Sequence, residues 1–219
     1  MNNNYRLPNI KKGFVHTNVK TVEQRAVLLG NYLPATKSIA EVCCGNCFYQ
    51  YQIYERELQI QKFLGLDIVP AVVEANKRQG VPCVCGDALN GAVLKNFLDF
   101  DVIFFGPPLS IECDGHQLMT FNEVVPSYSE FVELLVGELK YGGTFICICP
   151  KTTTMGDIRK LYNAVKIQND KYGLAVIHYS YSDITSDGTV TESRLKYVEL
   201  WFSTALEDRW EIQESKPDK

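Results

Sequence analysis

The sequence contains no run of about 18 apolar residues, so no segment is long enough to cross a membrane as a helix. Its first residues, MNNNYRLPNI, are polar and lack the apolar core of a secretion signal, so we expect a cytoplasmic protein. A basic surplus is also missing, because 22 lysines and arginines against 26 aspartates and glutamates leave a formal net charge of -4. The overall charge therefore gives no sign of a strongly basic nucleic-acid-binding surface.

Internal repeats and low-complexity linkers are absent from the 219 residues, a length typical of one α/β domain. The hydrophobic fraction of 46% is enough for a substantial core. We therefore expect residues 1–206 to form a single domain that begins with an N-terminal arm. The polar tail, residues 207–219, is expected to fray.

The eight cysteines are expected to be free thiols, because no export signal accompanies them. Most lie in apolar, strand-like runs, where cysteine packs as a small hydrophobe. Cys44 and Cys47 nevertheless form a C-x-x-C, and Cys83 and Cys85 form a C-x-C, so redox or zinc chemistry remains an alternative. We expect packed thiols and no metal.

Seven apolar, β-branched runs recur along the chain with helical patterns between most of them. They cover residues 38–44, 62–68, 82–86, 101–106, 143–149, 173–180 and 196–202. Runs that are apolar on both faces predict strands of a parallel sheet covered by helices on both sides. The polar segment between the last two runs contains Asp187-Gly188 and predicts a long hairpin. The expected fold is a doubly wound α/β domain with a mostly parallel, seven-stranded sheet and an antiparallel last strand.

Local signals predict where several helices begin. Thr21 with Gln24, and Ser127 with Glu130, have the spacing of capping boxes. Pro70 suits the first turn of a helix, because its missing N–H would have no partner there. These positions predict helices between the strand-like runs.

Three acidic residues stand at the ends of the first three predicted strands. Glu41 is followed closely by Gly45, which has no Cβ and lets a ligand approach the backbone. Asp67 ends the second strand, where an acid can accept hydrogen bonds from ribose hydroxyls, and Asp87 ends the third, where an acid could hold a purine amine. Each acid alone could also be a helix cap or a solvated loop residue. At three successive strand ends they indicate a nucleotide-like ligand.

From Lys12 to Phe202, the order of these features resembles the class I S-adenosylmethionine-dependent methyltransferases. That family has seven strands, the seventh antiparallel, and a first motif of an acid followed by x-G-x-G-x-G. Glu41 and Gly45 match this frame, with Cys43 and Cys47 at positions usually held by glycine. A nicotinamide-dependent oxidoreductase is disfavoured, because its G-x-G-x-x-G fingerprint is absent.

The resemblance implies S-adenosylmethionine as the cofactor. The loop after Glu41 would pass its methionine end, Asp67 its ribose and Asp87 its adenine amine. In KKGFVHT, Thr17 matches a segment that closes over the methionine carboxylate in related enzymes, although a disordered arm is an equal alternative. The implied cofactor-binding residues are Thr17, Glu41, Cys43, Gly45, Cys47, Asp67, Ile68, Asp87 and Ala88.

The run DVIFFGPPLS ends a buried strand on two prolines. In the nucleic-acid amino-methyltransferases, the fourth strand ends in (Asp, Asn or Ser)-Pro-Pro-(aromatic), and EVCCGNC also resembles the first motif of that group. The residues implied to be catalytic are Gly106, Pro107, Pro108 and Leu109. Prolines lock the backbone, so carbonyls there can grip an amine in a preorganised geometry.

This corner departs from the pattern of the group at both ends. Gly106 has no side-chain acceptor, so the carbonyls of Gly106 and Pro107 remain as acceptors. Leu109 has no ring on which a flipped base could stack. Stacking could instead come from Phe105, Phe121 or Tyr128.

The resemblance implies N-methylation of an exocyclic base amine in RNA or DNA. One domain leaves no room for a separate recognition domain, so the loop after Pro108, the N-terminal arm or a partner subunit would recognise the target. His116 in that loop could orient the substrate or accept a proton, or it could be a surface histidine without a role. The alternatives are a non-catalytic or partner-dependent subunit with the same fold, and a methyltransferase acting on a protein or small molecule.

Overall fold

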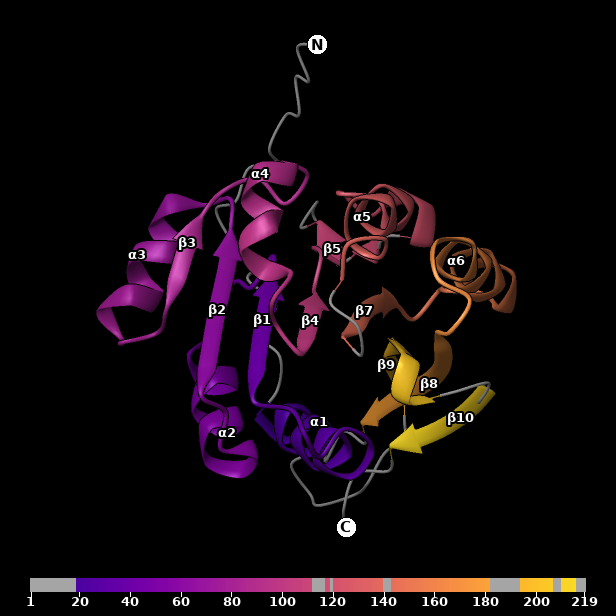
Figure 1. The fold of residues 1–219 in the computed structure, drawn as a ribbon, viewed down its shortest axis with the longest axis horizontal. Helices are drawn as coiled ribbons and strands as arrows, with labels where there is room; N and C mark the ends of the chain where they lie inside the picture. The colour runs from indigo at the N-terminus through magenta and orange to yellow at the C-terminus, as the bar shows by residue number, and fades with distance from the viewer. Residues whose placement is uncertain are drawn as a thin grey trace.

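A computed structural model describes residues 19–111, 117–118, 120–139, 143–181, 194–206 and 210–215. Its main sheet has the strand order β3-β2-β1-β4-β7-β9-β8-β10 (Figure 1). The strands are β1 (Ser38–Val42), β2 (Lys62–Asp67), β3 (Cys83–Cys85), β4 (Val102–Phe105), β7 (Thr144–Pro150), β8 (Gly173–Tyr181), β9 (Arg194–Ser203) and β10 (Trp210–Ser215). A separate antiparallel pair joins β5 (Ser110–Ile111) to β6 (Gln117–Leu118).

All seven predicted strands are confirmed, with ends that shift by one or two residues. Strands β1, β2, β3, β4 and β7 run parallel to one another, whereas β9 runs antiparallel to both β7 and β8. The doubly wound sheet with an antiparallel seventh strand is therefore confirmed. The expected turn at Asp187-Gly188 lies outside the described residues.

The C-terminal segment differs from its expected fraying. Trp210–Ser215 forms β10, an eighth strand that pairs in parallel with β8. The tail is polar, but β8 leaves one edge open, and an open edge can pair with any extended backbone regardless of side-chain polarity. The polar composition of the tail therefore gave no sign of this backbone pairing.

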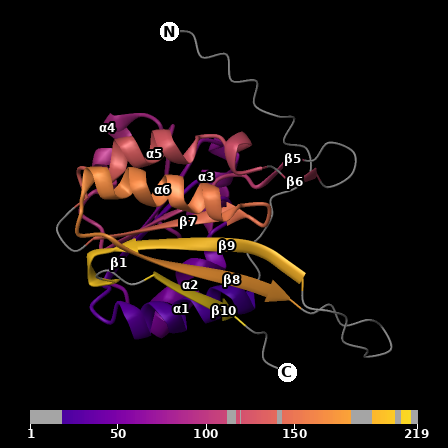
Figure 2. The same ribbon diagram turned by 90° about the vertical axis from the view of Figure 1, so that its right-hand side faces the viewer.

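Helices cover both faces of the sheet. One face carries α1 (Val19–Tyr32), α2 (Phe48–Leu58) and α3 (Pro70–Arg78), whose apolar side chains join one core cluster. The other carries α4 (Gly91–Leu94), α5 (Tyr128–Leu135) and α6 (Met155–Gln168), which pack into a second cluster. In Figure 2 the second group lies above the strands, with α1 and α2 below. The short 3₁₀ helices are η1 (Lys95–Phe97), η2 (Phe121–Glu123) and η3 (Thr204–Leu206).

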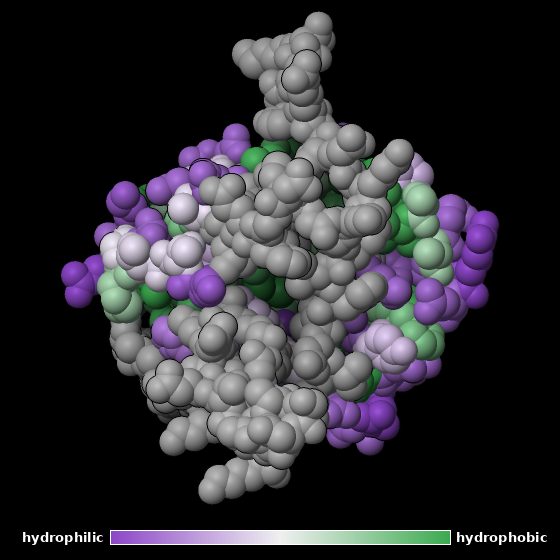
Figure 3. Space-filling view, turned by 180° about the vertical axis from the view of Figure 1, so that it is seen from behind, coloured by the Kyte–Doolittle hydropathy of each residue, from purple (hydrophilic) through white to green (hydrophobic). Residues whose placement is uncertain are grey.

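The surface formed by the described residues is mainly hydrophilic on the face seen in Figure 3, with smaller hydrophobic areas between polar ones. None of the described helices combines the length and hydropathy that a membrane crossing requires.

Two of the helix-start predictions are confirmed and one is wrong. Ser127 and Glu130 form a reciprocal capping box at the start of α5, and Pro70 occupies the first turn of α3. Helix α1, however, begins at Val19, so Thr21 lies inside its first turn and is not the N-cap. The hydroxyl of Thr21 is buried without a hydrogen-bond partner in the described part of the chain.

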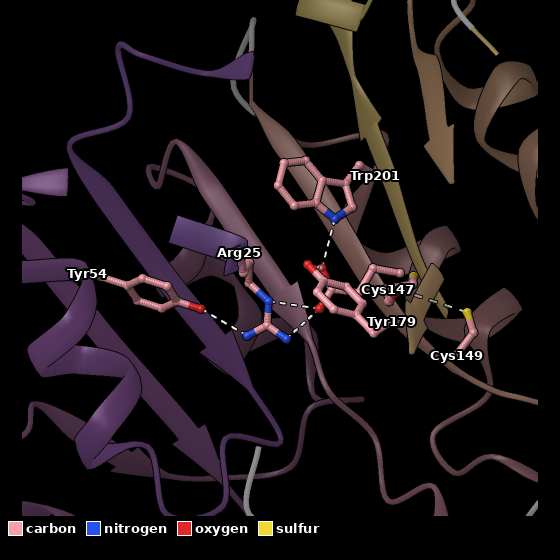
Figure 4. Close-up of polar contacts among 7 residues, drawn as sticks. Arg25, Tyr54, Cys147, Cys149, Tyr179 and Trp201 are labelled. Carbon is pink, nitrogen blue, oxygen red and sulfur yellow. Dashed lines mark hydrogen bonds and ion pairs between the residues drawn. The ribbon is translucent and has the colours of Figure 1, made fainter. Parts of the chain in front are cut away.

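An ion pair is buried between α1 and the sheet. Nε of Arg25 donates to Oε1 of Glu199 on β9 at 2.8 Å, and a second guanidinium nitrogen donates to the same oxygen. The other oxygen of Glu199 accepts from Tyr179 on β8 and from Trp201 on β9 (Figure 4). Arg25 also donates to the Tyr54 hydroxyl on α2, so one guanidinium joins two helices to the far half of the sheet.

Removal of one member of this pair should destabilise the protein strongly. We expect Arg25→Met to lower the free energy of unfolding by roughly 3–5 kcal/mol, because it leaves the buried Glu199 carboxylate without its charged partner. The double variant Arg25→Met/Glu199→Met should lose less than the sum of the two single variants, as measured by urea denaturation. Arg56→Met, at an exposed ion pair, is the control and should leave the midpoint unchanged. A double variant that loses as much stability as the two single variants together would contradict an energetic coupling between Arg25 and Glu199.

Candidate active site

The carboxyl ends of β1, β2, β3 and β4 meet at one edge of the sheet, because these strands are parallel neighbours. Val42 of β1 lies opposite Leu66 of β2 and Phe105 of β4. The predicted residues that follow these strands therefore share this edge. In open α/β sheets, ligands bind at this kind of edge.

The loop between β1 and α2, residues 43–47, has an unusual backbone, and we call it the glycine loop. Cys43 and Gly45 both have positive φ, at 57° and 55°. A left-handed conformation is unfavourable for a residue with a Cβ, so Cys43 carries strain that its surroundings must offset. A Cβ on Gly45 would meet no atom of the described residues within 4 Å. Within the described part of the chain, the loop thus leaves its backbone uncovered at Gly45, as the glycine at this position predicts.

Asp67 holds this loop. Its Oδ2 accepts the backbone N–H of Gly45 at 2.9 Å, and its Oδ1 accepts that of Val69 at 2.9 Å. An ionised carboxylate has about four acceptor positions, so Asp67 can still accept hydrogen bonds from a ligand.

Asn76 is a residue of the candidate site that sequence reasoning missed. It is fully buried on α3, where its Nδ2 donates to the carbonyl of Gly45 at 2.8 Å and its Oδ1 accepts from the N–H of Cys47 at 3.2 Å. Asn76 and Asp67 together clamp both sides of Gly45. One signal could have revealed it, because Asn76 is polar and lies on the same helical face as the apolar Val72 and Val73.

Glu41 is a buried acid at the end of β1. Its Oε1 has no hydrogen-bond partner among the described residues. Burial raises the pKa of Glu41 to about 7, although the Arg25 charge and a hydrogen bond from Tyr54 lower it, and the Glu199 charge raises it. Arg25 already donates two hydrogen bonds to Glu199. A free acceptor therefore lies close to the glycine loop and suits a cationic or hydrogen-bond-donating ligand.

The remaining predicted cofactor residues have mixed environments. Asp87 is exposed, and its Oδ1 accepts the N–H of Leu89 at 2.9 Å, as in a turn. Ala88 is buried and Ile68 is 49% exposed, so Ile68 has apolar surface available to a ligand. Thr17, and with it the KKGFVHT segment, lies outside the described residues.

The Gly-Pro-Pro-Leu corner lies directly beside the glycine loop. The N–H of Gly106 donates to the carbonyl of Val42 at 3.0 Å, and a Cβ at Gly106 would lie 3.9 Å from the carbonyl oxygen of Cys43. Pro107 is buried and Pro108 is exposed. Leu109 is half-buried against the core cluster under α5. The corner and the loop thus approach each other through their backbones.

Only one of the three candidate stacking rings has a suitable position. Phe105 is fully buried and stacks on Phe131 in the core, at 3.9 Å between ring centres, so it is unavailable. Tyr128 is also buried, and its hydroxyl donates to the carbonyl of Ile148 at 2.6 Å. Phe121 is half-buried and stacks on Tyr128 at 4.5 Å, which leaves part of its ring exposed.

The described residues contain no group of three or more histidine, cysteine, aspartate or glutamate side chains that could hold a metal ion. A shallow hollow lined by Tyr51, Lys62 and Phe63 among others lies at the amino end of β2, opposite the predicted site. His116 lies outside the described residues, so its role stays a prediction.

No protein-family model matches this chain, and no curated protein matches it in sequence. Solved structures do match its fold. A methyltransferase from Archaeoglobus fulgidus that depends on S-adenosylmethionine has a TM-score of 0.56 and 12% identity, over 85% of this chain and 94% of that one. This chain has the class I methyltransferase fold.

Two further structures share this methyltransferase fold. Precorrin-6y C5,15-methyltransferase from Geobacter metallireducens has a TM-score of 0.55 and 13% identity, covering 82% of this chain and 87% of its own. A Listeria monocytogenes protein assigned to the class I S-adenosylmethionine-dependent methyltransferases has a TM-score of 0.59 and 14% identity. The match covers 90% of this chain and 65% of that one. Such identities establish a shared fold, and a fold alone does not determine a substrate.

The buried Glu41 predicts a pH dependence of stability. Its folded pKa lies above the usual value of 4.5, so the folded state keeps a proton that the unfolded chain releases. The contribution of Glu41 to the free energy of unfolding is fully present below about pH 4.5 and is lost as the pH rises through about 7. Glu41→Gln should remove this slope and raise stability above pH 7 by at most about 3 kcal/mol.

Urea denaturation at several pH values would measure this effect. Glu133→Gln, at an exposed position on α5, is the control and should keep the wild-type slope. A Glu41→Gln profile identical to that of the wild type would contradict a buried acid with a raised pKa.

Proposed function

We propose that this protein is an S-adenosylmethionine-dependent methyltransferase that methylates an exocyclic amine of a nucleic-acid base. One observation carries the proposal: Gly106, the first residue of the proline corner, lies against the Val42–Cys43 backbone, where β1 leads into the glycine loop. A loop suited to the cofactor and a corner suited to an amine are therefore adjacent. Direct transfer between two bound groups requires this proximity.

The residues fit the cofactor. Among the described residues, one buried oxygen of Glu41 has no hydrogen-bond partner and no atom lies within 4 Å of a Cβ on Gly45. Asp67 retains acceptor capacity beside the same loop. Glu41 and Gly45 would hold the methionine end, Asp67 the ribose, and Asp87 and Ala88 the adenine. When bound, S-adenosylmethionine supplies an electrophilic methyl group on a sulfonium. An ammonium group beside Glu41 would lower its pKa, so binding near neutral pH should release a proton.

The corner after β4 supports amine chemistry through its backbone. The lone pair of an exocyclic base amine is delocalised into the ring, so acceptors must bind its two hydrogens before the nitrogen can attack. The carbonyls of Gly106 and Pro107 are the available acceptors, and the two prolines restrict their orientation. Positioning and electrostatics would account for catalysis, with no covalent intermediate on the protein.

Phe121 supports a role in holding the base. Its ring stacks on that of Tyr128. The ring of Phe105, the residue immediately before the corner, contacts the Tyr128 ring edge-on, with 5.6 Å between the ring centres. Leu109 and Phe121 also pack against the same core cluster. A base flipped out of a nucleic acid commonly stacks on an aromatic ring of this kind.

The second candidate is methylation of a protein or small molecule, or a partner-dependent subunit of the same fold. The net charge of -4 favours these alternatives, because a nucleic acid repels an acidic surface. A basic partner subunit that recognises the target would reconcile the charge with a nucleic-acid substrate.

Titration calorimetry of the reduced protein tests the cofactor. We expect micromolar binding of S-adenosylmethionine and S-adenosylhomocysteine, and at least a tenfold loss in Asp67→Ala, which removes both a ligand acceptor and the clamp on Gly45. Asp170→Ala is the control, because Asp170 is exposed just before the amino end of β8. No binding to the wild-type chain would refute a working cofactor site in the isolated protein.

Transfer of a labelled methyl group to RNA, DNA, protein and small-molecule fractions tests the acceptor. With a nucleic acid, Phe121→Leu should lower kcat/KM about 10-fold to 100-fold, because base stacking on an aromatic ring contributes roughly 1–3 kcal/mol. Phe121→Tyr keeps the ring and should stay near wild type, and cofactor affinity should not change in either variant. Labelling of protein or small molecules alone would favour the second candidate.

A further inference from the structure

Three cysteines converge beneath the glycine loop. The sulfurs of Cys44 and Cys83 are 3.7 Å apart. A Cβ built on Gly65 of β2 would lie 2.9 Å from the sulfur of Cys44, 3.1 Å from that of Cys83 and 3.3 Å from that of Cys47. Cys47 is fully buried, and the other two are less than a tenth exposed. Gly65 therefore leaves room for a cluster of three thiols that any larger residue would displace.

The surroundings distinguish the two closest thiols. The amide Nδ2 of Asn76 lies 3.8 Å from the sulfur of Cys83 and 3.9 Å from that of Cys44. A hydrogen bond from Cys44, together with Asn76, lowers the pKa of Cys83, whereas hydrogen bonds with Cys47 and Cys83 raise the pKa of Cys44. The opposite directions of these shifts favour Cys83 over Cys44 as the thiol that is oxidised first. A thiol with a lowered pKa beside a second thiol can be oxidised to a disulfide by an oxidant small enough to reach the buried pair.

We propose that Cys44 and Cys83 form a redox-active pair, which a peroxide converts to a disulfide that displaces the glycine loop. The effect on cofactor binding rests on the proposed function, whereas the disulfide itself does not. This assigns to the thiol cluster a chemical role beyond packing.

The oxidation balances with hydrogen peroxide as the oxidant. The Cys83 thiolate attacks one peroxide oxygen, the O–O bond breaks, and Cys83 becomes a sulfenic acid while hydroxide takes a proton to form water. The Cys44 thiol then attacks the sulfenic sulfur, so an S–S bond forms and the S–O bond breaks, and the departing hydroxide takes the Cys44 proton and leaves as a second water. Two thiols and one peroxide thus yield one disulfide and two waters.

The movement that this bond requires falls on the loop. A disulfide is about 2.05 Å long, so the two sulfurs must approach by roughly 1.6 Å. Cys83 lies in β3, which is held in register by β2, whereas Cys44 follows β1 in the loop. Movement of Cys44 pulls on Gly45, whose N–H and carbonyl are bound by Asp67 and Asn76. Oxidation should therefore weaken the clamp that shapes the loop.

Peptide mapping of the full chain tests the pair directly. The reduced protein is treated with hydrogen peroxide, the remaining thiols are alkylated, and disulfide-linked peptides are identified by mass spectrometry. We expect a Cys44–Cys83 link that dithiothreitol reverses and that both Cys44→Ser and Cys83→Ser abolish. Cys85→Ser is the matched control, because Cys85 belongs to the same strand but is exposed, and it should retain the link. A Cys44–Cys47 link, or no link, would overturn the proposal.

Two further measurements separate this proposal from the proposed function. Hydrogen exchange of the Gly45 amide, measured without cofactor, should accelerate on oxidation of the wild type and not of Cys83→Ser. An unchanged rate in a protein with the mapped link would refute the loop movement. Calorimetry should show at least tenfold weaker S-adenosylmethionine binding after oxidation, with recovery on reduction. If the reduced protein fails to bind, the proposed function fails, while mapping and exchange still decide the redox pair.

Discussion

The packing of α1 and α2 against β8 and β9 depends on the ion pair between Arg25 and Glu199. Both side chains are buried, so the surrounding residues must supply every hydrogen bond that water would otherwise provide. Tyr54, Tyr179 and Trp201 do so from one helix and two strands. Glu41 lies near the same guanidinium, but Arg25 is bound to Glu199, and burial raises the pKa of Glu41. Among the described residues, this network thus leaves an oxygen of Glu41 without a hydrogen-bond partner at the edge of the site.

The residues that hold the glycine loop in place also belong to the proposed cofactor site and thiol cluster. Asp67 and Asn76 fix the two sides of Gly45, and Cys43 remains left-handed beside it. Asn76 also contacts the sulfurs of Cys44 and Cys83, so the clamp and the thiol cluster have a common member. A change in the thiols would reach the loop through contacts that already exist. No relay across the fold is needed.

Several elements could be predicted from the chain because their signals are local. The apolar runs predicted the seven strands, and the polar segment before β9 predicted the antiparallel pairing. The capping box at Ser127 depends on residues three apart and was also correct. The Thr21 prediction was wrong because the same spacing occurs inside a helix, and α1 begins two residues earlier. The pairing of β10 was missed because an open strand edge is a property of the assembled sheet.

The sequence by itself determined the fold class. It also determined that Glu41, Asp67, Asp87 and the proline corner lie at one edge of the sheet, because parallel strands bring their carboxyl ends together there. Tertiary structure decided which side chains remain available there. It buried Phe105 and left Phe121 half-exposed, and it placed Asn76 against Gly45. It also brought Cys44, Cys47 and Cys83 together over Gly65. These outcomes depend on contacts between residues distant in sequence, which only the packed sheet and helices bring within reach.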